Sequence, residues 1–238
     1  MEPDEYARMA AVEDGMWWYR ALHTRLLEAL ADQPAASRGP TLDAGCGTGG
    51  LLTLINPSHA AYGLEWNADA AAIAAAKSGR PIARGSINEL PFASDSFGTA
   101  IAADVLCHAA VEPARALAEI KRVLRPQGRL IVNMPAFRAL MSAHDARVHN
   151  ARRMNLRETR AMLEDAGFRV LRAGYWNGLL LPLMILHRKF LAGSSERSDV
   201  AVFPPWLDRM LHGMTELERR LHIPLPAGGS VLAVAERP

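Results

Sequence analysis

Hydrophobic residues along this chain gather into short apolar segments that alternate with longer amphipathic ones. A run of about four to eight mostly apolar residues is typical of a buried strand, and apolar residues three or four positions apart are typical of a helix. The expected strands are residues 41–44, 61–65, 81–84, 97–102, 129–134, 168–175 and 230–235. Strands that alternate with helices predict a mostly parallel sheet with helices on both faces.

The segments between these strands carry helical signals. The expected helices are residues 16–30, 48–55, 68–77, 113–124, 178–191 and 206–221. A further helix is expected to begin at Asn155, which has Glu158 at capping-box spacing, and to end at Gly167, where a C-terminal glycine is favoured. Pro182 is expected to disturb the helix at 178–191, because proline cannot donate a backbone hydrogen bond.

The chain of 238 residues is long enough for one large domain. We expect a single domain over residues 1–238, with a helical cap at 1–39 and a cofactor-binding core at 40–135. Residues 136–238 are then expected to form the acceptor-side half, which includes a helical insertion at 177–228.

A glycine-rich loop follows the first expected strand. Gly45, Gly47 and Gly50 stand at the spacing of a dinucleotide-binding loop, and Glu65 ends the next strand, where an acid binds ribose hydroxyls. Glycine lets a ligand approach the backbone closely. These residues predict a nucleoside site and leave its ligand open between a dinucleotide such as NAD and another adenosine cofactor.

Later segments distinguish the two ligands. Residues 85–92 and 95–98 are similar to the loop that caps adenine in class I S-adenosylmethionine-dependent methyltransferases, and residues 105–108 and 116–130 are also very like that family. Gln127 stands where the family more often has glycine, a departure that we expect to be harmless. The chain thus resembles the small-molecule, type 11-like branch of the family. The resemblance implies a Rossmann-like, seven-stranded, mostly parallel sheet, with the helical insertion placed between its last two strands.

The resemblance also implies S-adenosylmethionine as the cofactor and a role for each matching residue. Asp43 is expected to fix the loop and the amino end of the methionine moiety, Gly45 and Gly47 to allow close approach, and Glu65 to bind the ribose diol. The residues expected beside adenine are Trp66, Ser86 and Ile87, and those beside the sulfonium are Ala103 and Asp104.

An aromatic cluster in the first expected helix, residues 17–20, is similar to one that closes the cofactor pocket in many members of a bacterial branch of the family. Helix packing explains Trp17 and Trp18 equally well. Tyr19 and Arg20 are the better candidates for cofactor contact, because each carries a polar tip.

The acceptor side is expected after the fifth strand. His144, His149 and His108 can titrate near neutral pH and are candidate bases, and Asp145 can orient them. The expected substrate-binding residues are Arg152, Arg153 and Trp176, of which the two arginines can hold a carboxylate or phosphate. The branch more often has tyrosine at the position of Met154. The histidine and aspartate spacing is unlike that of a metal site, and we expect none.

The apolar insertion at 177–228 has three interpretations. We rank first an extension of the core that also forms a lid over an apolar substrate, second a contact between two copies of the chain, and third a patch that associates with a membrane surface.

Composition and charge limit the kinds of partner and the cellular location that we expect. A net charge of +2 does not favour nucleic acid, and two cysteines, one of them in the glycine loop, favour reduced thiols and a cytoplasmic location. The acidic start of the chain does not resemble a secretory signal, and the apolar run at 178–186 is too short to cross a bilayer as a helix. The sequence therefore predicts methyl transfer to a small, partly apolar acceptor that can carry an anionic group. The alternatives are an NAD-dependent oxidoreductase, a non-catalytic cofactor-binding protein and, more weakly, an RNA methyltransferase.

Overall fold

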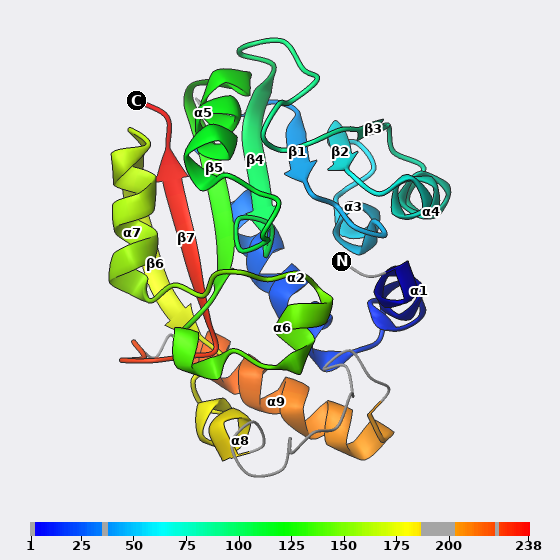
Figure 1. The fold of residues 1–238 in the computed structure, drawn as a ribbon, viewed down its shortest axis with the longest axis vertical. Coiled ribbons are helices and arrows are strands. Elements are labelled where there is room, and N and C mark those ends of the chain that lie inside the picture. Colours follow the sequence, from blue (N-terminus) through cyan, green and yellow to red (C-terminus); the bar gives the residue numbers. More distant parts are fainter. Residues whose placement is uncertain (1–2, 35–37, 187–202, 222–223) are drawn as a thin grey trace.

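A computed structural model describes residues 3–34, 38–186, 203–221 and 224–238. Its centre is one seven-stranded sheet with strand order β3-β2-β1-β4-β5-β7-β6 (Figure 1). The strands are β1 Thr41–Ala44, β2 Ala61–Glu65, β3 Ile82–Arg84, β4 Phe97–Ala103, β5 Leu124–Pro135, β6 Arg169–Trp176 and β7 Ser230–Glu236. β7 runs antiparallel to both of its neighbours, and the pairs from β3 to β5 are parallel. The predicted α/β fold with a mostly parallel sheet is confirmed.

The expected helices appear in the predicted order with changed ends, and two further helices, α1 and α6, are present. They are α1 Pro3–Val12, α2 Trp17–Ala31, α3 Gly50–Leu54, α4 Ala68–Ser78, α5 Pro113–Val123, α6 Ala143–Arg147, α7 Leu156–Asp165, α8 Leu181–Leu186 and α9 Pro205–Leu221, with a 3-10 turn at Arg138–Leu140. The capping box at Asn155 and Glu158 forms as predicted, and Gly167 takes a left-handed φ of 77° after α7. The part of the expected 178–191 helix beyond Leu186 lies outside the described residues.

Helices cover both faces of the sheet. Successive side chains of a strand point to opposite faces, so a strand of apolar residues presents apolar surface on each side. Ala100 and Ala102 of β4 belong to the core beneath α5 and α7, whereas Ile101 packs with Leu22 and Leu26 of α2 on the other face. Because β1, β2 and β4 run parallel, their carboxyl ends lie at one edge of the sheet, the edge at which open α/β sheets bind ligands.

β5 begins at Leu124 rather than at residue 129, because Leu124 pairs with Phe97 before the register shifts. The segment around Gln127 is therefore an irregularity within the strand. Gln127 takes a φ of 65°, a left-handed conformation that favours glycine, and donates its backbone N–H to Arg237 O at 2.8 Å. The exchange of glycine for glutamine places strain at this position.

The sequence pattern did not predict α1 or α6. α1 lies next to α3 at the edge of the sheet where β1 and β2 end (Figure 1). Met9 of α1 lies against Gly47 of the glycine loop.

Candidate functional site

The glycine loop leaves β1 in a conformation that side chains would block. Gly45 and Gly47 have φ values of 95° and 55°, in the left-handed region. A Cβ atom on Gly45 would lie 2.4 Å from Val105 Cγ2, and one on Gly47 would lie 2.5 Å from Met9 Cε of α1. The predicted helix at 48–55 is reduced to α3, Gly50–Leu54, since the loop occupies its first turn.

Glu65 closes the loop from the neighbouring strand. Its Oε2 accepts the Gly47 N–H at 3.0 Å, and its Oε1 accepts the Asn67 N–H at 2.9 Å and the Tyr6 hydroxyl at 3.3 Å. Burial raises the pKa of Glu65, which the backbone donors partly offset. The carboxylate is thus fixed at the carboxyl end of β2, the place where the sequence predicted a ribose-binding acid.

Asp43 is a buried carboxylate without a partner in the part of the chain that the structure describes. It is 3% exposed, and neither a hydrogen bond nor an ion pair to its side chain is found among those residues. Burial, followed by the charges of Glu65 and Glu13, raises the pKa of Asp43 to about 7. A carboxylate left in this state favours a ligand that brings a positive charge or hydrogen-bond donors.

Glu13, just after α1, is a site residue that the sequence analysis missed. It is buried, accepts a hydrogen bond from Thr48 Oγ1 and forms an ion pair with Lys77 Nζ at 2.7 Å. A Cβ on Gly50 would lie 2.6 Å from Glu13 Oε2, so this acid covers the third glycine. Tyr6 and Met9, three positions apart, are the signal for α1 that could have been recognised.

The charge at the carboxyl edge of the sheet distinguishes between a dinucleotide and S-adenosylmethionine, the two ligands that the glycine spacing left open. Asp43, Glu13 and Glu65 surround the loop, and Lys77, which pairs with Glu13 and Asp14, is the basic partner recorded for this group among the described residues. A pyrophosphate would meet carboxylates there, whereas S-adenosylmethionine carries an ammonium and a sulfonium. The residues present therefore fit S-adenosylmethionine and do not fit a dinucleotide.

A chain of hydrogen bonds orients Asp104 at the end of β4. The Trp176 indole donates from Nε1 to Asn133 Oδ1 at 2.8 Å, and Asn133 Nδ2 donates to Asp104 Oδ1 at 2.9 Å. Because an indole N–H can only donate, it fixes which way the Asn133 amide points. Burial raises the pKa of Asp104 to about 7, although the Asn133 hydrogen bond and the Arg153 charge lower it.

Trp176 was expected to bind substrate, and its position is a correction to that expectation. It is 4% exposed within the core, its ring lies 6.3 Å from that of Trp18, and the Arg25 guanidinium stands 4.6 Å above it. Its role in this geometry is to position Asn133 and, through it, Asp104.

The residues expected around adenine lie at different depths. Ile87 is buried, Ser86 is half-buried and accepts the Asn88 N–H at 3.1 Å, and Trp66 is 71% exposed. The exposure of Trp66 rules out a role in packing the core. Ala103, beside Asp104, regains partial exposure at the end of a strand that is otherwise buried.

Tyr19 and Arg20 separate in the structure. Tyr19 is close enough to Glu13 and Asp104 for their charges, after burial, to raise its pKa. Arg20 instead forms an ion pair with Asp208 of α9 at 2.5 Å, so it ties two helices together rather than facing the glycine loop. Tyr19 remains a site candidate, and Arg20 does not.

On the acceptor side, Asp145 and Arg153 neutralise each other. Arg153 donates from Nε to Asp145 Oδ1 and from Nη2 to Oδ2, both at 3.0 Å, and from Nη1 to Ala136 O at 3.2 Å. Ser142 N–H and Asn150 Nδ2 also donate to the same carboxylate, at 2.8 Å and 3.2 Å. Both members of the pair are buried. Their geometry is structural, which corrects the catalytic role expected for Asp145 and the substrate role expected for Arg153.

The expected bases lie near this pair. Ala109 N–H donates to His149 O at 2.8 Å, which brings the His108 and His149 segments together, and His144 lies in α6. Burial lowers the pKa of His108 to about 4, which makes it a weak base. Arg152 donates to His108 O at 2.6 Å and stays half-buried.

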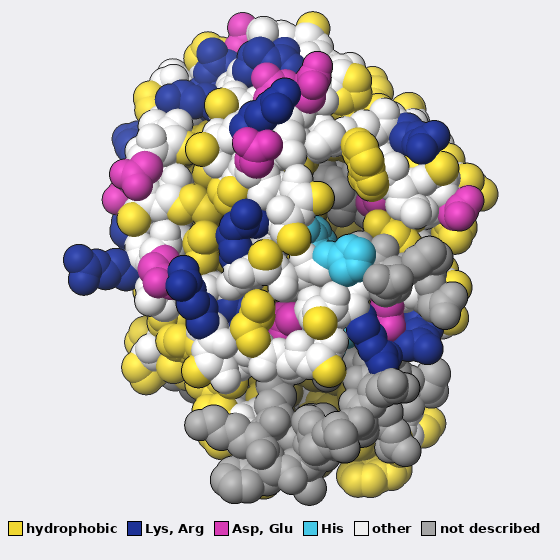
Figure 2. All heavy atoms as spheres, in the orientation of Figure 1, with side chains coloured by type: hydrophobic (Ala, Val, Ile, Leu, Met, Phe, Trp, Pro, Cys, Tyr) yellow, Lys and Arg dark blue, Asp and Glu magenta, His cyan; other side chains and the backbone are white. Residues whose placement is uncertain are grey.

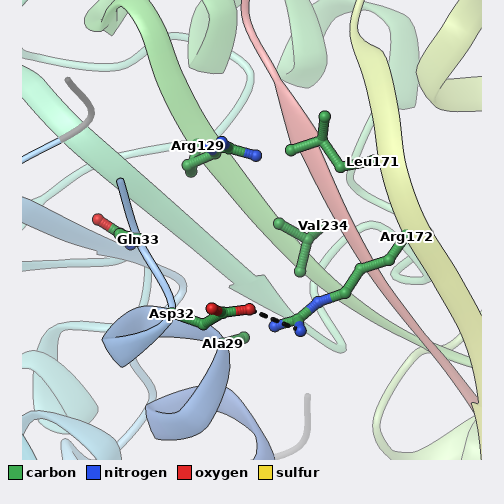
Figure 3. A pocket seen from close by; sticks show the side chains of 7 residues that line it. All are labelled: Ala29, Asp32, Gln33, Arg129, Leu171, Arg172 and Val234. Atoms are coloured by element: carbon green, nitrogen blue, oxygen red, sulfur yellow. Dashed lines mark hydrogen bonds and ion pairs between the residues drawn. The ribbon is translucent and has the colours of Figure 1, made fainter. Parts of the chain in front are cut away.

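Two cavities lie away from the glycine loop. One of about 200 Å³ lies at the opposite end of the sheet, where Asp32 and Arg172 form an ion pair at 2.9 Å (Figure 3). The other, about 560 Å³ and open to solvent, is lined by the stacked rings of Phe137 and Tyr175 and by residues 155–157 and Arg160. Neither contains a residue expected at the cofactor site. The described residues hold no group of three or more His, Cys, Asp or Glu side chains placed to bind a metal ion.

Residues 42–132 match the sequence model of a family described as "Methyltransferase domain". The matched span contains the glycine loop, Glu65 and Asp104, the residues that meet at the carboxyl edge of the sheet. The match covers less than half of the chain and makes this segment similar to a methyltransferase domain. Within the matched segment, Asp43 and Glu65 lie at the carboxyl edge of the sheet, the edge at which open α/β sheets bind ligands.

Two relatives extend the match beyond the domain. The chain is 33% identical over 148 residues to an uncharacterized 37.1 kDa protein in a transposon of Streptomyces fradiae, over 58% of this chain and 41% of that protein. It is 34% identical over 128 residues to an uncharacterized protein of Methanocaldococcus jannaschii, over 53% of this chain and 48% of that protein. The chain thus spans less than half the length of the curated relatives it matches.

Solved structures share the fold. One is in the complex between a methyltransferase and the Trm112 methyltransferase activator of Haloferax volcanii, with a TM-score of 0.64, 23% identity, and coverage of 99% of this chain and 96% of that chain. Another is a geranyl diphosphate methyltransferase bound to geranyl diphosphate and sinefungin, with a TM-score of 0.63, 18% identity, and coverage of 92% and 79%. At such identities the likeness establishes the fold alone.

Among the described helices, none combines the length and apolar character that a membrane crossing requires.

Proposed function

We propose that this chain is an S-adenosylmethionine-dependent methyltransferase that acts on a small acceptor with an apolar body and an anionic group. The observation that carries the proposal is Asp43, a buried carboxylate without a partner among the described residues, placed at the glycine loop beside Glu65 and Glu13. A cationic nucleoside satisfies this set of acids, and a pyrophosphate does not.

Each part of the cofactor has a proposed partner. Asp43 holds the ammonium end of the methionine moiety, Glu65 holds the ribose diol, and Gly45 and Gly47 allow the backbone to come close. The adenine is held by Ile87, Ser86 and the exposed ring of Trp66. Tyr19 lies among the acids that face the methionine end.

When bound, the cofactor supplies an activated methyl group. The protein must then hold the acceptor in line with that group and exclude water. For an amine or hydroxyl acceptor we propose Asp104 as the proton acceptor, because Asn133 orients its carboxylate and burial brings its pKa to about 7. His149 and His144 stay candidate bases, and Arg152 stays a candidate for holding the anionic group.

The acceptor class has support from one structural neighbour. Geranyl diphosphate joins an apolar chain to an anionic group, and the enzyme named for methylating it shares the fold of this chain. A small acceptor is also favoured over nucleic acid, since basic and acidic side chains are interspersed on the face in Figure 2 rather than gathered into one basic tract. A homodimer and a cytoplasmic location remain predictions from the sequence.

Calorimetric titration of the full chain with S-adenosylhomocysteine and with NAD tests the cofactor. We expect S-adenosylhomocysteine to bind at micromolar concentration and NAD to give no heat of binding. Binding of NAD in preference would contradict the proposal and favour the oxidoreductase.

Transfer of the radiolabelled methyl group from S-adenosylmethionine to geranyl diphosphate, compared with simple amines and alcohols, tests the reaction. We expect turnover of an acceptor that is both apolar and anionic, and Asp104→Asn should move the pH profile when the acceptor must lose a proton. Tight cofactor binding with no transfer to any of these acceptors would favour a non-catalytic cofactor-binding protein.

A further inference from the structure

One face of α9 presents apolar side chains to solvent. Trp206, Met210, Leu217 and Leu221 are 64%, 46%, 53% and 58% exposed. At about 100° of rotation per residue, these positions fall within roughly 60° of one another around the helix. A Cβ on Gly213, which lies in the same sector, would meet no atom within 4 Å. We call these five residues the α9 strip.

The core does not need the α9 strip, because the opposite face of α9 already fixes the helix. Leu211 packs with Trp17 and Leu180, and Glu218 accepts the Gly178 N–H at 2.8 Å. Arg25 Nη2 of α2 donates to Thr215 O at 2.8 Å. The strip is thus held outward by a helix that is anchored on its other side.

The acids of α9 are all engaged by arginines. Asp208 pairs with Arg20 at 2.5 Å, Glu216 with Arg219 at 2.6 Å and Glu218 with Arg25 at 3.6 Å. Glu218 is buried, and Asp208 and Glu216 are half-buried, so none of the three carboxylates is fully exposed. Glu216 lies closest to the α9 strip by helical rotation, and it is the carboxylate paired with Arg219.

The charged residues on the exposed face are instead basic. Arg209 is exposed, and the Arg220 side chain remains 75% exposed although it lies 3.6 Å from Glu216. Both positions fall on the same border of the α9 strip by helical rotation. The solvent face of α9 therefore joins an apolar strip, tryptophan at one end, to a border of positive charge.

α8 adds apolar surface beside α9. Leu179, Leu183 and Leu186 are 37%, 48% and 48% exposed, and the packing of Leu180 on Leu211 ties this segment to α9. Figure 1 draws α8 and α9 next to each other at the lower end of the molecule.

We propose that the α9 strip docks this protein on the surface of a membrane that contains anionic lipids. A helix with an apolar face bordered by arginine lies in the interfacial plane, its side chains among the acyl chains and its cations beside the headgroups. A second copy of the chain is a poorer occupant, because it brings arginines and no exposed carboxylate to the same face. The proposal does not depend on the methyltransferase activity.

Sedimentation of the full chain with vesicles tests the docking. At low salt we expect binding to vesicles of phosphatidylcholine mixed with phosphatidylglycerol, and at least tenfold weaker binding to phosphatidylcholine alone. Leu217→Glu should weaken binding to the mixed vesicles at least tenfold. Leu54→Glu is the matched control, since Leu54 is 54% exposed on α3, and it should bind like the unchanged chain.

The double variant Arg209→Gln/Arg220→Gln tests the charge. Each cation near an anionic surface contributes about 1 kcal/mol, so partitioning should fall by about 25-fold and lose most of its dependence on salt. Failure of the unchanged chain to bind mixed vesicles overturns the proposal. So does a dimer, detected by light scattering, that Leu217→Glu dissociates while vesicle binding is absent.

Discussion

Buried carboxylates at the two sides of this molecule differ in what neutralises them. At the ends of β1 and β2, Asp43 and Glu65 face no ion-pair partner among the described residues, and burial raises the pKa of both. On the acceptor side, Asp145 forms a bidentate pair with Arg153. Burial alone would raise the pKa of Asp145, but the Arg153 charge together with the hydrogen bonds from Arg153, Asn150 and Ser142 lowers it.

This difference distinguishes a buried acid that can bind a ligand from one that holds the protein's own structure. A buried acid without a cation destabilises the protein alone, and a positively charged ligand relieves that cost. A buried acid that is paired and hydrogen-bonded holds its loop in place and has little left to offer a ligand. Residue type alone does not distinguish these cases, because both are aspartates in polar segments.

The largest expected effect is on the paired acid. Asp145→Ala leaves Arg153 buried without its partner, which should lower the free energy of unfolding by about 3–5 kcal/mol in a denaturant titration. The double variant Asp145→Leu/Arg153→Met should recover most of this loss, since it removes both charges. If Asp145→Ala kept its stability and lost cofactor binding, Asp145 would have to be assigned to ligand binding and not to the structure of its loop.

Two buried acids with raised pKa values, Asp43 and Asp104, should make the ligand-free protein sensitive to pH. The folded pKa of Asp43 and of Asp104 is about 7, above the unfolded value, so stability falls as pH rises through 7. From pH 6 to pH 8 the melting temperature should drop by about 5 °C. His23 and His108 act in the opposite sense below pH 6.5, because burial lowers the pKa of each to about 4. Asp43→Asn should make the drop smaller, and an unchanged drop would contradict the assignment.

A smaller effect on cofactor affinity is expected from Glu65, the acid proposed to bind the ribose. Glu65→Ala should weaken S-adenosylhomocysteine binding about tenfold, roughly 1.4 kcal/mol, measured by calorimetry. Glu65→Gln keeps an acceptor for the Gly47 N–H and separates ribose binding from loop structure. Glu164→Ala is a control, because Glu164 forms an exposed ion pair with Arg160 within α7, away from the expected cofactor residues. Unchanged affinity in both Glu65 variants would remove the ribose assignment.

The smallest expected effect concerns backbone strain at Gln127, which lies away from both the glycine loop and the acceptor side. Gln127→Gly should raise the free energy of unfolding by less than about 1 kcal/mol, because relief of the left-handed conformation exceeds the added flexibility of glycine. Gln127→Ala should give no gain. Destabilisation by the glycine would show that the conformation carries no strain.

Periodicity predicted the sheet because its strands are buried on both faces, as in Leu42–Ala44 and Phe97–Ala102. The glycine loop and Glu65 were also predictable, since their roles need particular backbone and residue types at fixed spacing. Glu13 and Tyr6 were missed because their contacts join segments far apart in the chain. The partners of Asp145 and Trp176 are likewise tertiary, so sequence could name these residues but not their roles.

The most direct test compares S-adenosylmethionine with adenosine as ligands of Asp43→Asn at pH 8. The two share the nucleoside, and only the first carries the charged methionine end. We predict that S-adenosylmethionine affinity falls at least tenfold while adenosine affinity changes by less than about twofold. An equal loss for both ligands, or no loss for either, would contradict the claim that the unpaired acid at the glycine loop binds the cationic end of the cofactor.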